Sequence, residues 1–183
     1  MSECHKFLFE GLPVRGMLVR LTDSWREVLA RRSGSGDERA GDAFAPPVRV
    51  LLGEMAAAGV LMQSNIRFNG ALVLQVYGEG PVKLAVAEVQ DDLAFRVTAK
   101  VVGEVPADAR LEAMVNLHGQ GRCAITLDPK DKRAGQQPYQ GVVALHSTAP
   151  SGAARPARRG PVLPQGGWYP RGGEGGQGYQ RCA

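Results

Sequence analysis

Residues 46–65 carry apolar side chains around nearly the whole circumference of a helix. Pro46 and Pro47 open this segment, at positions where a missing N–H would have had no partner within the helix. Small residues at 56–59 allow another element to approach closely. A helix that is apolar all round is typically buried on several sides rather than laid on a surface. The segment therefore predicts a central core helix with sheet around it.

Segments with the pattern of strands lie on both sides of this helix. Residues 5–9 and 14–21, separated by turn residues, predict a hairpin, and residues 22–33 predict a helix capped at 22–24. The later expectations are strands at 71–77, 82–89, 93–102, 123–127 and 139–145, with a short helix over 106–114 that Asp108 caps. The predicted fold class is α+β, with a largely antiparallel sheet around a buried apolar helix.

The C-terminal segment, residues 146–183, differs sharply in composition from residues 1–145. Its five arginines and single glutamate account for the whole net charge of +4, so residues 1–145 are neutral overall. It also holds nine of the 24 glycines and five of the 12 prolines, and it shows no apolar period. Such a chain cannot offset an ordering cost of about 1–2 kcal/mol per residue. We expect a body over 1–145 and a disordered Gly/Pro/Arg-rich basic tail over 146–183.

Two classes of protein are not expected from the sequence. Its longest mostly apolar stretch, residues 48–62, contains Arg49 and Glu54, and a membrane span needs roughly 20 apolar residues. The N-terminus lacks the basic and then apolar pattern of a signal peptide. We expect neither a membrane span nor a membrane partner.

The three cysteines, Cys4, Cys123 and Cys182, form no C-x-C or C-x-x-C pair. Cys123 alternates with Ile125 in an expected strand, which indicates a small buried hydrophobe. Cys4 and His5 could offer two metal ligands, but the sequence shows no candidate for a third and a fourth ligand. Cys182 is expected to be an exposed thiol. The sequence predicts no metal site.

Catalysis by a side-chain nucleophile needs a base next to it and a group that orients that base. The histidines, His5, His118 and His146, lie in no recognisable motif of this kind. The sequence GEGP at 78–81 lacks the following helix and the Lys-Ser/Thr pair of a phosphate-binding loop, and is interpreted as a hairpin turn. We expect no catalytic or cofactor-binding residue, and not an enzyme.

The basic tail offers an alternative function. Its arginines alternate with Trp168, Tyr169 and Tyr179, a composition that can bind nucleic acid by phosphate neutralisation and base stacking. Five arginines in 38 residues are sparse for such a tract, so nucleic acid is not the favoured partner. Binding of this kind would weaken steeply between about 50 and 200 mM salt.

A set of short segments carries a family resemblance across the body. They are HKFLF at 5–9, VRG at 14–16, LLGEM at 51–55, IRFNG at 66–70, LQVYGEGP at 74–81, GQG at 119–121, ITL at 125–127 and YQGVVAL at 139–145. In order and spacing they resemble the redox-regulated holdase chaperones, the thirty-three-kilodalton heat-shock chaperonin family. The body thus resembles that family's N-terminal core domain.

The resemblance implies a cytoplasmic, ATP-independent chaperone that binds unfolded or aggregating client proteins under oxidative or heat stress and forms homodimers when active. In that family a helical linker and a zinc domain follow the core, and four cysteines, as C-x-C and C-x-x-C, hold zinc or form disulfides. This sequence contains none of those motifs, so zinc is not an expected cofactor and the redox switch is expected to be absent.

The resemblance ends at Leu145, just before the end of the family's core domain, so we expect residues 1–145 to be a core domain incomplete at its C-terminal edge. We hypothesise that residues 146–183 are an out-of-frame reading, because Arg, Gly, Pro and Ala have GC-rich codons. A coding sequence without the cysteine motifs in its other frames would refute this. Two outcomes are open for such a body. It binds clients without needing oxidation, because the regulatory cover is gone, or it self-associates and dissolves poorly, because sheet edges and apolar faces stay open; the second outcome is expected.

A holdase needs exposed apolar surface rather than catalytic residues. Val60, Leu61 and Met62 are candidates either for the core or for the client-binding surface, and their place in the apolar helix favours the core.

Overall fold

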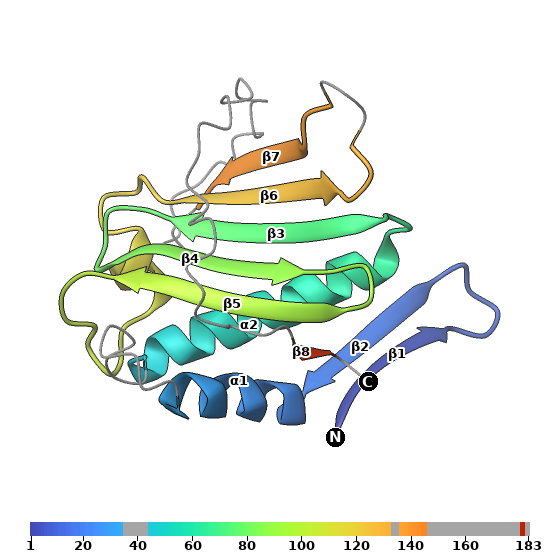
Figure 1. Cartoon of the computed structure of the whole chain (residues 1–183), viewed down its shortest axis with the longest axis horizontal. Coiled ribbons are helices and arrows are strands. Elements are labelled where there is room, and N and C mark those ends of the chain that lie inside the picture. Colours follow the sequence, from blue (N-terminus) through green and yellow to red (C-terminus); the bar gives the residue numbers. More distant parts are fainter. Residues whose placement is uncertain (35–43, 133–135, 146–179, 182–183) are drawn as a thin grey trace.

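The computed structural model describes residues 1–34, 44–132, 136–145 and 180–181 (Figure 1). Its elements are β1 (Ser2–Leu8), β2 (Arg15–Leu21), α1 (Thr22–Gly34), α2 (Pro46–Asn65), β3 (Gly70–Tyr77), β4 (Val82–Val89), β5 (Ala94–Val101), α3 (Leu111–Val115), β6 (Arg122–Pro129), β7 (Tyr139–Ala144) and β8 (Gln180–Arg181). The strands pair antiparallel throughout, which confirms the expected α+β class.

A six-stranded sheet with the order β7-β6-β3-β4-β5-β8 forms the body of the molecule (Figure 1). Short turns join β3 to β4 and β4 to β5, as the sequence predicts. The chain then passes through α3 and returns so that β6 pairs with the free edge of β3, where Leu74 lies opposite Ile125. β7 continues from β6 as the outermost strand on that side.

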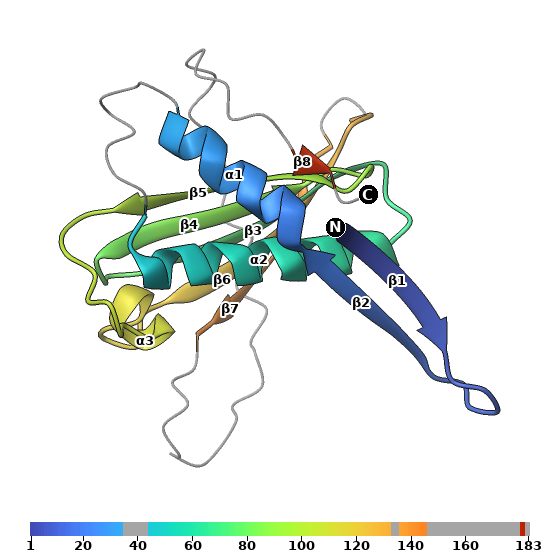
Figure 2. The same cartoon turned by 90° about the horizontal axis from the view of Figure 1, so that it is seen from below.

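Helix α2 lies across one face of the sheet (Figure 2), and its buried residues form two adjacent rows that repeat every four positions. They are Pro47, Val48, Leu51, Leu52, Met55, Ala56, Gly59, Val60 and Gln63. A Cβ added at Gly59 would lie 2.8 Å from Val89 Cγ2, so this glycine lets the helix approach β4. The expected core helix is confirmed for this face.

The outward side of α2 differs from the expectation of burial on several sides. Val50 is 59% exposed, and Leu61 and Met62 are only partly buried. The physical reason is the layering, since the sheet covers only one side of the helix (Figure 2). An apolar circumference therefore leaves apolar side chains at the surface here.

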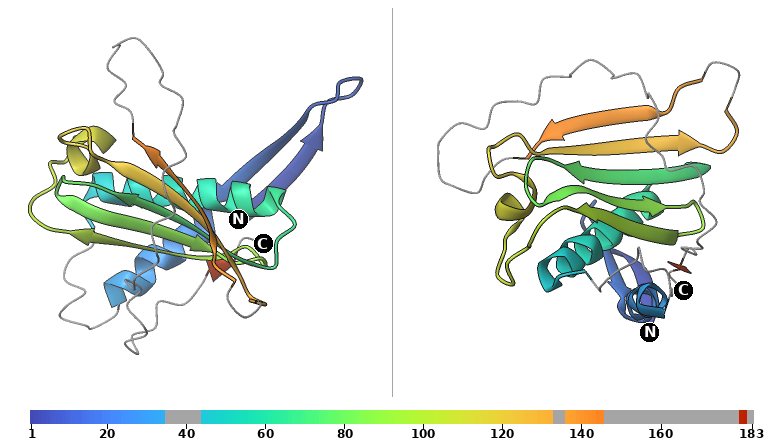
Figure 3. Two further views of the ribbon diagram at one scale, coloured as in Figure 1. Left: turned by 90° about the horizontal axis from the view of Figure 1, so that it is seen from above. Right: turned by 60° about the vertical axis from the view of Figure 1, so that its left-hand side comes forward.

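The β1–β2 hairpin forms a separate two-stranded sheet that projects away from the body (Figure 3). Helix α1 follows it directly, and Trp25 packs against Gly53 of α2. The start of α1 is tied to the hairpin, because the Ser24 N–H and hydroxyl both donate to Ser2 Oγ at 2.9 Å. Both the hairpin and the helix after it were predicted from the sequence and are confirmed.

One expectation about local structure is wrong. The short helix begins at Leu111 instead of 106, and the residue at its N-cap is Arg110, without a side-chain cap bond, instead of Asp108. Residues 106–109 form a turn, closed by the Ala109 N–H donating to Pro106 O at 3.0 Å. Gln180–Arg181 pairs with β5, and the rest of 146–183, where a disordered tail is expected, lies outside the described residues, so that expectation stays a prediction.

Asn116 ties the end of β7 to the segment after α3. The buried side chain accepts a hydrogen bond from the Gly121 N–H at 2.7 Å and donates one to Leu145 O at 3.1 Å.

Asn116→Ala is expected to lower the free energy of unfolding by about 1–3 kcal/mol, because it leaves backbone groups without these partners. Urea unfolding measures this, with Asn65→Ala on the exposed end of α2 as the control expected to change less. Equal losses in the two variants would contradict the assignment.

Every helix among the described residues is too short or too polar to cross a membrane.

Candidate functional site

Two apolar side chains of strand β6 lie on the α2 side of the sheet and are only half-buried there. Ile125 and Leu127 alternate along the strand with buried Ala124 and Thr126, whose side chains point to the other face. The register places Leu72 of β3 beside Leu127. Both β6 side chains pack against the core only in part, so the remainder of each is available to a ligand.

The first hollow at this place lies between the C-terminal end of α2 and the sheet. It has a volume of about 390 Å³ and is open to solvent. Its lining residues are Leu61, Met62, Asn65, Ile66, Leu72, Ile125 and Leu127. All but one of these side chains are apolar, and the exception is an uncharged amide.

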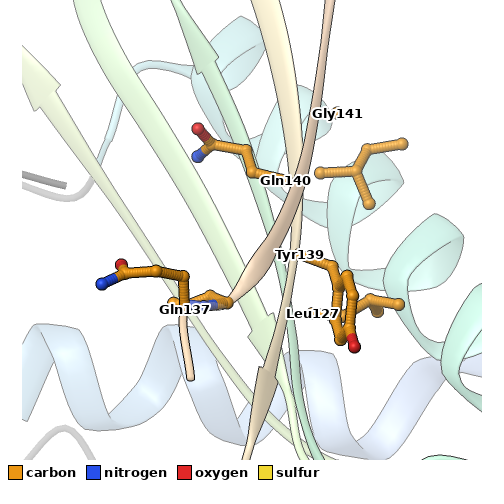
Figure 4. A pocket seen from close by; sticks show the side chains of 7 residues that line it. Leu127, Gln137, Tyr139, Gln140 and Gly141 are labelled. Atoms are coloured by element: carbon orange, nitrogen blue, oxygen red, sulfur yellow. The ribbon is translucent and has the colours of Figure 1, made fainter. Parts of the chain in front are cut away.

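A second hollow of about 750 Å³ continues from the first to the edge of the sheet. Its lining residues are Ile125, Leu127, Gln137, Pro138, Tyr139, Gln140 and Gly141. Figure 4 shows the Tyr139 ring beside Leu127, while the amides of Gln137 and Gln140 point away from it. Because the two hollows share Ile125 and Leu127, they form one continuous surface, which we call the β6 surface.

The β6 surface contains no charged side chain among its lining residues. Two lysines that follow β6 are each paired with a carboxylate. Lys132 Nζ lies 2.6 Å from Asp128 Oδ1, and Lys130 pairs with Asp91. The hydrogen bond from Lys130 holds the pKa of the Asp91 carboxyl below its usual value. The surface therefore suits an uncharged apolar ligand rather than a phosphate or an acidic peptide.

The three candidate residues of the core helix have different places in the structure. Val60 is fully buried, which confirms its prediction as a core residue. Leu61 and Met62 line the β6 surface, and they are half-buried rather than enclosed. Ile125 and Leu127 were not singled out from the sequence as surface residues. Their alternation predicted a strand but did not tell which face would remain open.

The tip of the hairpin carries a second group of exposed apolar side chains. They are Phe7, Leu8, Phe9, Leu12 and Val14. The Phe7 and Phe9 rings meet edge to face at 5.6 Å between centroids. In Figures 2 and 3 the tip projects away from the sheet, so it is not continuous with the β6 surface.

A third hollow, of about 420 Å³, lies between the first half of α2 and the segment that leads into α3. Val50 and Leu111 give it an apolar part. It also includes Glu54, Asp108 and Arg110, so it is a mixed site without the uniform character of the β6 surface.

The candidate metal ligands among the described residues do not gather into one site. Cys4 lies in β1 and Cys123 in β6, which belong to different sheets. His5 pairs with Glu3 at 3.0 Å on the exposed hairpin. Within the described part of the chain, no three potential ligands gather around a metal position. His146, Cys182 and the arginines at 155–171 lie outside it.

Cys123 is a small hydrophobe as expected, but it is half-buried rather than enclosed. It packs against the core on the α2 side of β6, and burial raises the pKa of its thiol. A raised pKa keeps the thiol protonated and poorly reactive near neutral pH. The cysteine therefore contributes packing rather than chemistry.

Comparisons with known proteins agree on one family. The sequence model of the Hsp33 protein family matches residues 2–151. The chain is 44% identical over 145 residues to the 33 kDa chaperonin of Chromobacterium violaceum, covering 79% of this chain and 44% of that protein. The corresponding protein of Methylobacillus flagellatus is 42% identical over 142 residues, covering 77% and 43%.

A solved structure shows the same fold. The 33 kDa chaperonin of Thermotoga maritima superposes with a TM-score of 0.58 at 19% identity, over 79% of this chain and 46% of that one. The chain thus spans a little less than half the length of the relatives it matches. Because the family match extends over most of the sequence, the chain belongs to the Hsp33 family.

Proposed function

We propose that the chain acts as an ATP-independent molecular chaperone, a holdase, that binds unfolded or aggregating proteins through the β6 surface. The observation that carries this proposal is a continuous, charge-free apolar surface in a member of the Hsp33 family. Fully burying a leucine or isoleucine side chain gains about 1.5–3 kcal/mol, so covering several half-exposed ones is sufficient for transient capture. Such binding does not depend on a particular client sequence.

The proposal needs no reaction and no catalytic residue. The matched relatives are named as chaperonins and not for a catalysed reaction, which supports the expectation that the chain is not an enzyme. Homodimer formation and cytoplasmic location stay predictions from the family resemblance.

We include in this proposal that client binding does not require oxidation of the chain. The family's zinc site needs four cysteines, and the described cysteines, Cys4 and Cys123, lie in different sheets. The residues present therefore do not fit zinc, and no step is assigned to the metal. Of the described thiols, those of Cys4 and Cys123 also lack the close pairing of a disulfide switch.

The test is suppression of aggregation of the insulin B chain, released from insulin by dithiothreitol and followed by light scattering. The reductant also keeps the chaperone thiols reduced. The wild-type protein is expected to suppress scattering. The double variant Ile125→Thr/Leu127→Thr is expected to raise the half-suppressing concentration about tenfold, because it removes the apolar anchors of two strand positions. Threonine is chosen because it keeps the strand preference of β6.

Leu8→Thr is the matched control, since it removes an exposed apolar side chain from the hairpin and not from the β6 surface. Its half-suppressing concentration should stay within about twofold of wild type. An equal effect of both changes would contradict the location. A wild-type protein that does not suppress scattering at all would contradict the holdase, and one that acts only without reductant would contradict oxidation-independence. Size-exclusion chromatography beforehand selects the unaggregated fraction of each variant.

The alternative function, nucleic-acid binding through the basic tail, concerns residues 146–183, most of which lie outside the described part of the chain. It would show as binding that is lost on deletion of 146–183 and in high salt. Client capture on the β6 surface should resist both changes.

A further inference from the structure

We propose that β7 binds an extended client segment as an added β-strand, with the β6 surface receiving the side chains of that segment. This proposal rests on the holdase function and specifies how the client is bound. It combines two features that lie side by side, a sheet edge with outward-pointing backbone groups and an uncharged apolar surface.

The direction of the backbone groups follows from one hydrogen bond. The Leu145 N–H donates to Gly121 O at 2.9 Å, so this pair is of the hydrogen-bonded kind. In an antiparallel ladder such pairs alternate with pairs whose backbone groups point outward. Residues 139, 141 and 143 therefore face β6, while the N–H and C=O groups of Gln140, Val142 and Ala144 point away from it. Within the described residues, no strand occupies this outer side.

Gly141 makes the edge accessible to a large side chain. It lies opposite Ile125 in the ladder, and a Cβ added to it would meet nothing within 4 Å. Tyr139 and Val143, two residues away on each side, are 64% and 44% exposed. A guest residue placed beside Gly141 would thus have Ile125 behind it and two apolar walls. Figure 4 shows Gly141 and Tyr139 on the strand that borders the hollow.

These features select an occupant of a particular chemistry. Backbone hydrogen bonds do not depend on the guest sequence, while the hollow favours apolar side chains at alternate positions. The lack of charge on the β6 surface disfavours acidic or basic segments. Folded proteins keep such strands paired, so the fitting partner is an uncharged, apolar, extended segment of an unfolded polypeptide.

The first experiment blocks the edge of the full chain with Val142→Pro. Because the Val142 N–H points outward, proline removes no bond to β6, but its ring removes the donor and obstructs an added strand. The probe is a fluorescein-labelled heptapeptide of alternating threonine and valine, followed by fluorescence anisotropy. Val142→Pro is expected to weaken binding about tenfold or more, and the matched Val142→Thr variant to bind within about twofold of wild type. Equal binding by Val142→Pro and wild type would overturn the proposal.

A second measurement does not depend on the folding of a variant. The same peptide, N-methylated at alternate residues on its pairing edge, keeps its side chains but loses the N–H groups that pair. It is expected to bind wild type about thirtyfold more weakly, as several backbone bonds are lost. Hydrogen exchange should also slow at the Val142 and Ala144 amides when the unmodified peptide binds. Equal binding of both peptides would overturn strand addition.

The outcomes separate this proposal from the holdase function. Suppression of insulin aggregation together with equal binding of both peptides would leave the holdase intact and overturn only the strand. Absence of both suppression and peptide binding would overturn the two proposals together. A dimer that Val142→Pro converts to a monomer, with peptide binding unchanged, would show that a second copy occupies the edge and would overturn the client assignment.

Discussion

Replacing Phe95 with alanine is expected to lower the free energy of unfolding by about 3–5 kcal/mol, the usual cost of emptying a fully buried aromatic position. Among the described residues, Phe95 is the largest side chain with no exposure, and it lies in β5 opposite Val89 of β4. Together with Val97 it faces the core. Removing the ring leaves a cavity under α2 that the surrounding strands and helix can fill only in part.

Urea unfolding followed by circular dichroism measures the loss caused by Phe95→Ala. The matched control is Val101→Ala at the end of the same strand, where the side chain is partly exposed and a loss of about 1 kcal/mol or less is expected. A Phe95→Ala protein as stable as its control would show that the layer under α2 is not the main core of the fold.

The sequence predicted those elements whose pattern is local. The two prolines and the apolar run specify α2, and alternation with turn residues specifies the hairpin and the strands from β3 to β5. The pairing of β6 with β3 instead of β5 was not predictable in this way. Both β3 and β5 lie at an edge of the β3-β4-β5 unit, and the local sequence pattern does not tell which of the two edges β6 joins. The start of α3 was missed because the turn at 106–109 also fits the first turn of a helix.

The sequence predicted that the candidate site is an exposed apolar surface, but it did not predict where that surface lies. Neighbouring positions on a helix point about 100° apart, so Val60 enters the core while Leu61 and Met62 reach the open side. Locating that side requires knowing that the sheet covers one face of α2 only. The role assigned to Gly141 depends further on the register, which places it opposite Ile125.

Hydrogen bonds at the end of β7 keep the proposed edge in a defined geometry. The end of β7 is held by the Leu145 N–H bond to Gly121 and by Asn116, which follows α3 directly. The turn between β3 and β4 lies against the end of α3, where Gly78 faces Val115 O. A disturbance of that turn should therefore reach both the core and the end of β7.

Replacing Gly78 with alanine is accordingly expected to destabilise the fold by about 3 kcal/mol or more, at the upper end of overpacking costs. The added Cβ would lie 1.7 Å from Val115 O and 3.2 Å from Gly121 Cα, so backbone and not a flexible side chain must move. Gly141→Ala is the matched control, because its Cβ meets open space and its stability should change by about 1 kcal/mol or less. Calorimetry measures the melting temperatures of both variants. If Gly78→Ala melted at the same temperature as Gly141→Ala, α3 would not be packed against this turn. The inference that α3 supports the end of β7 would then be wrong as well.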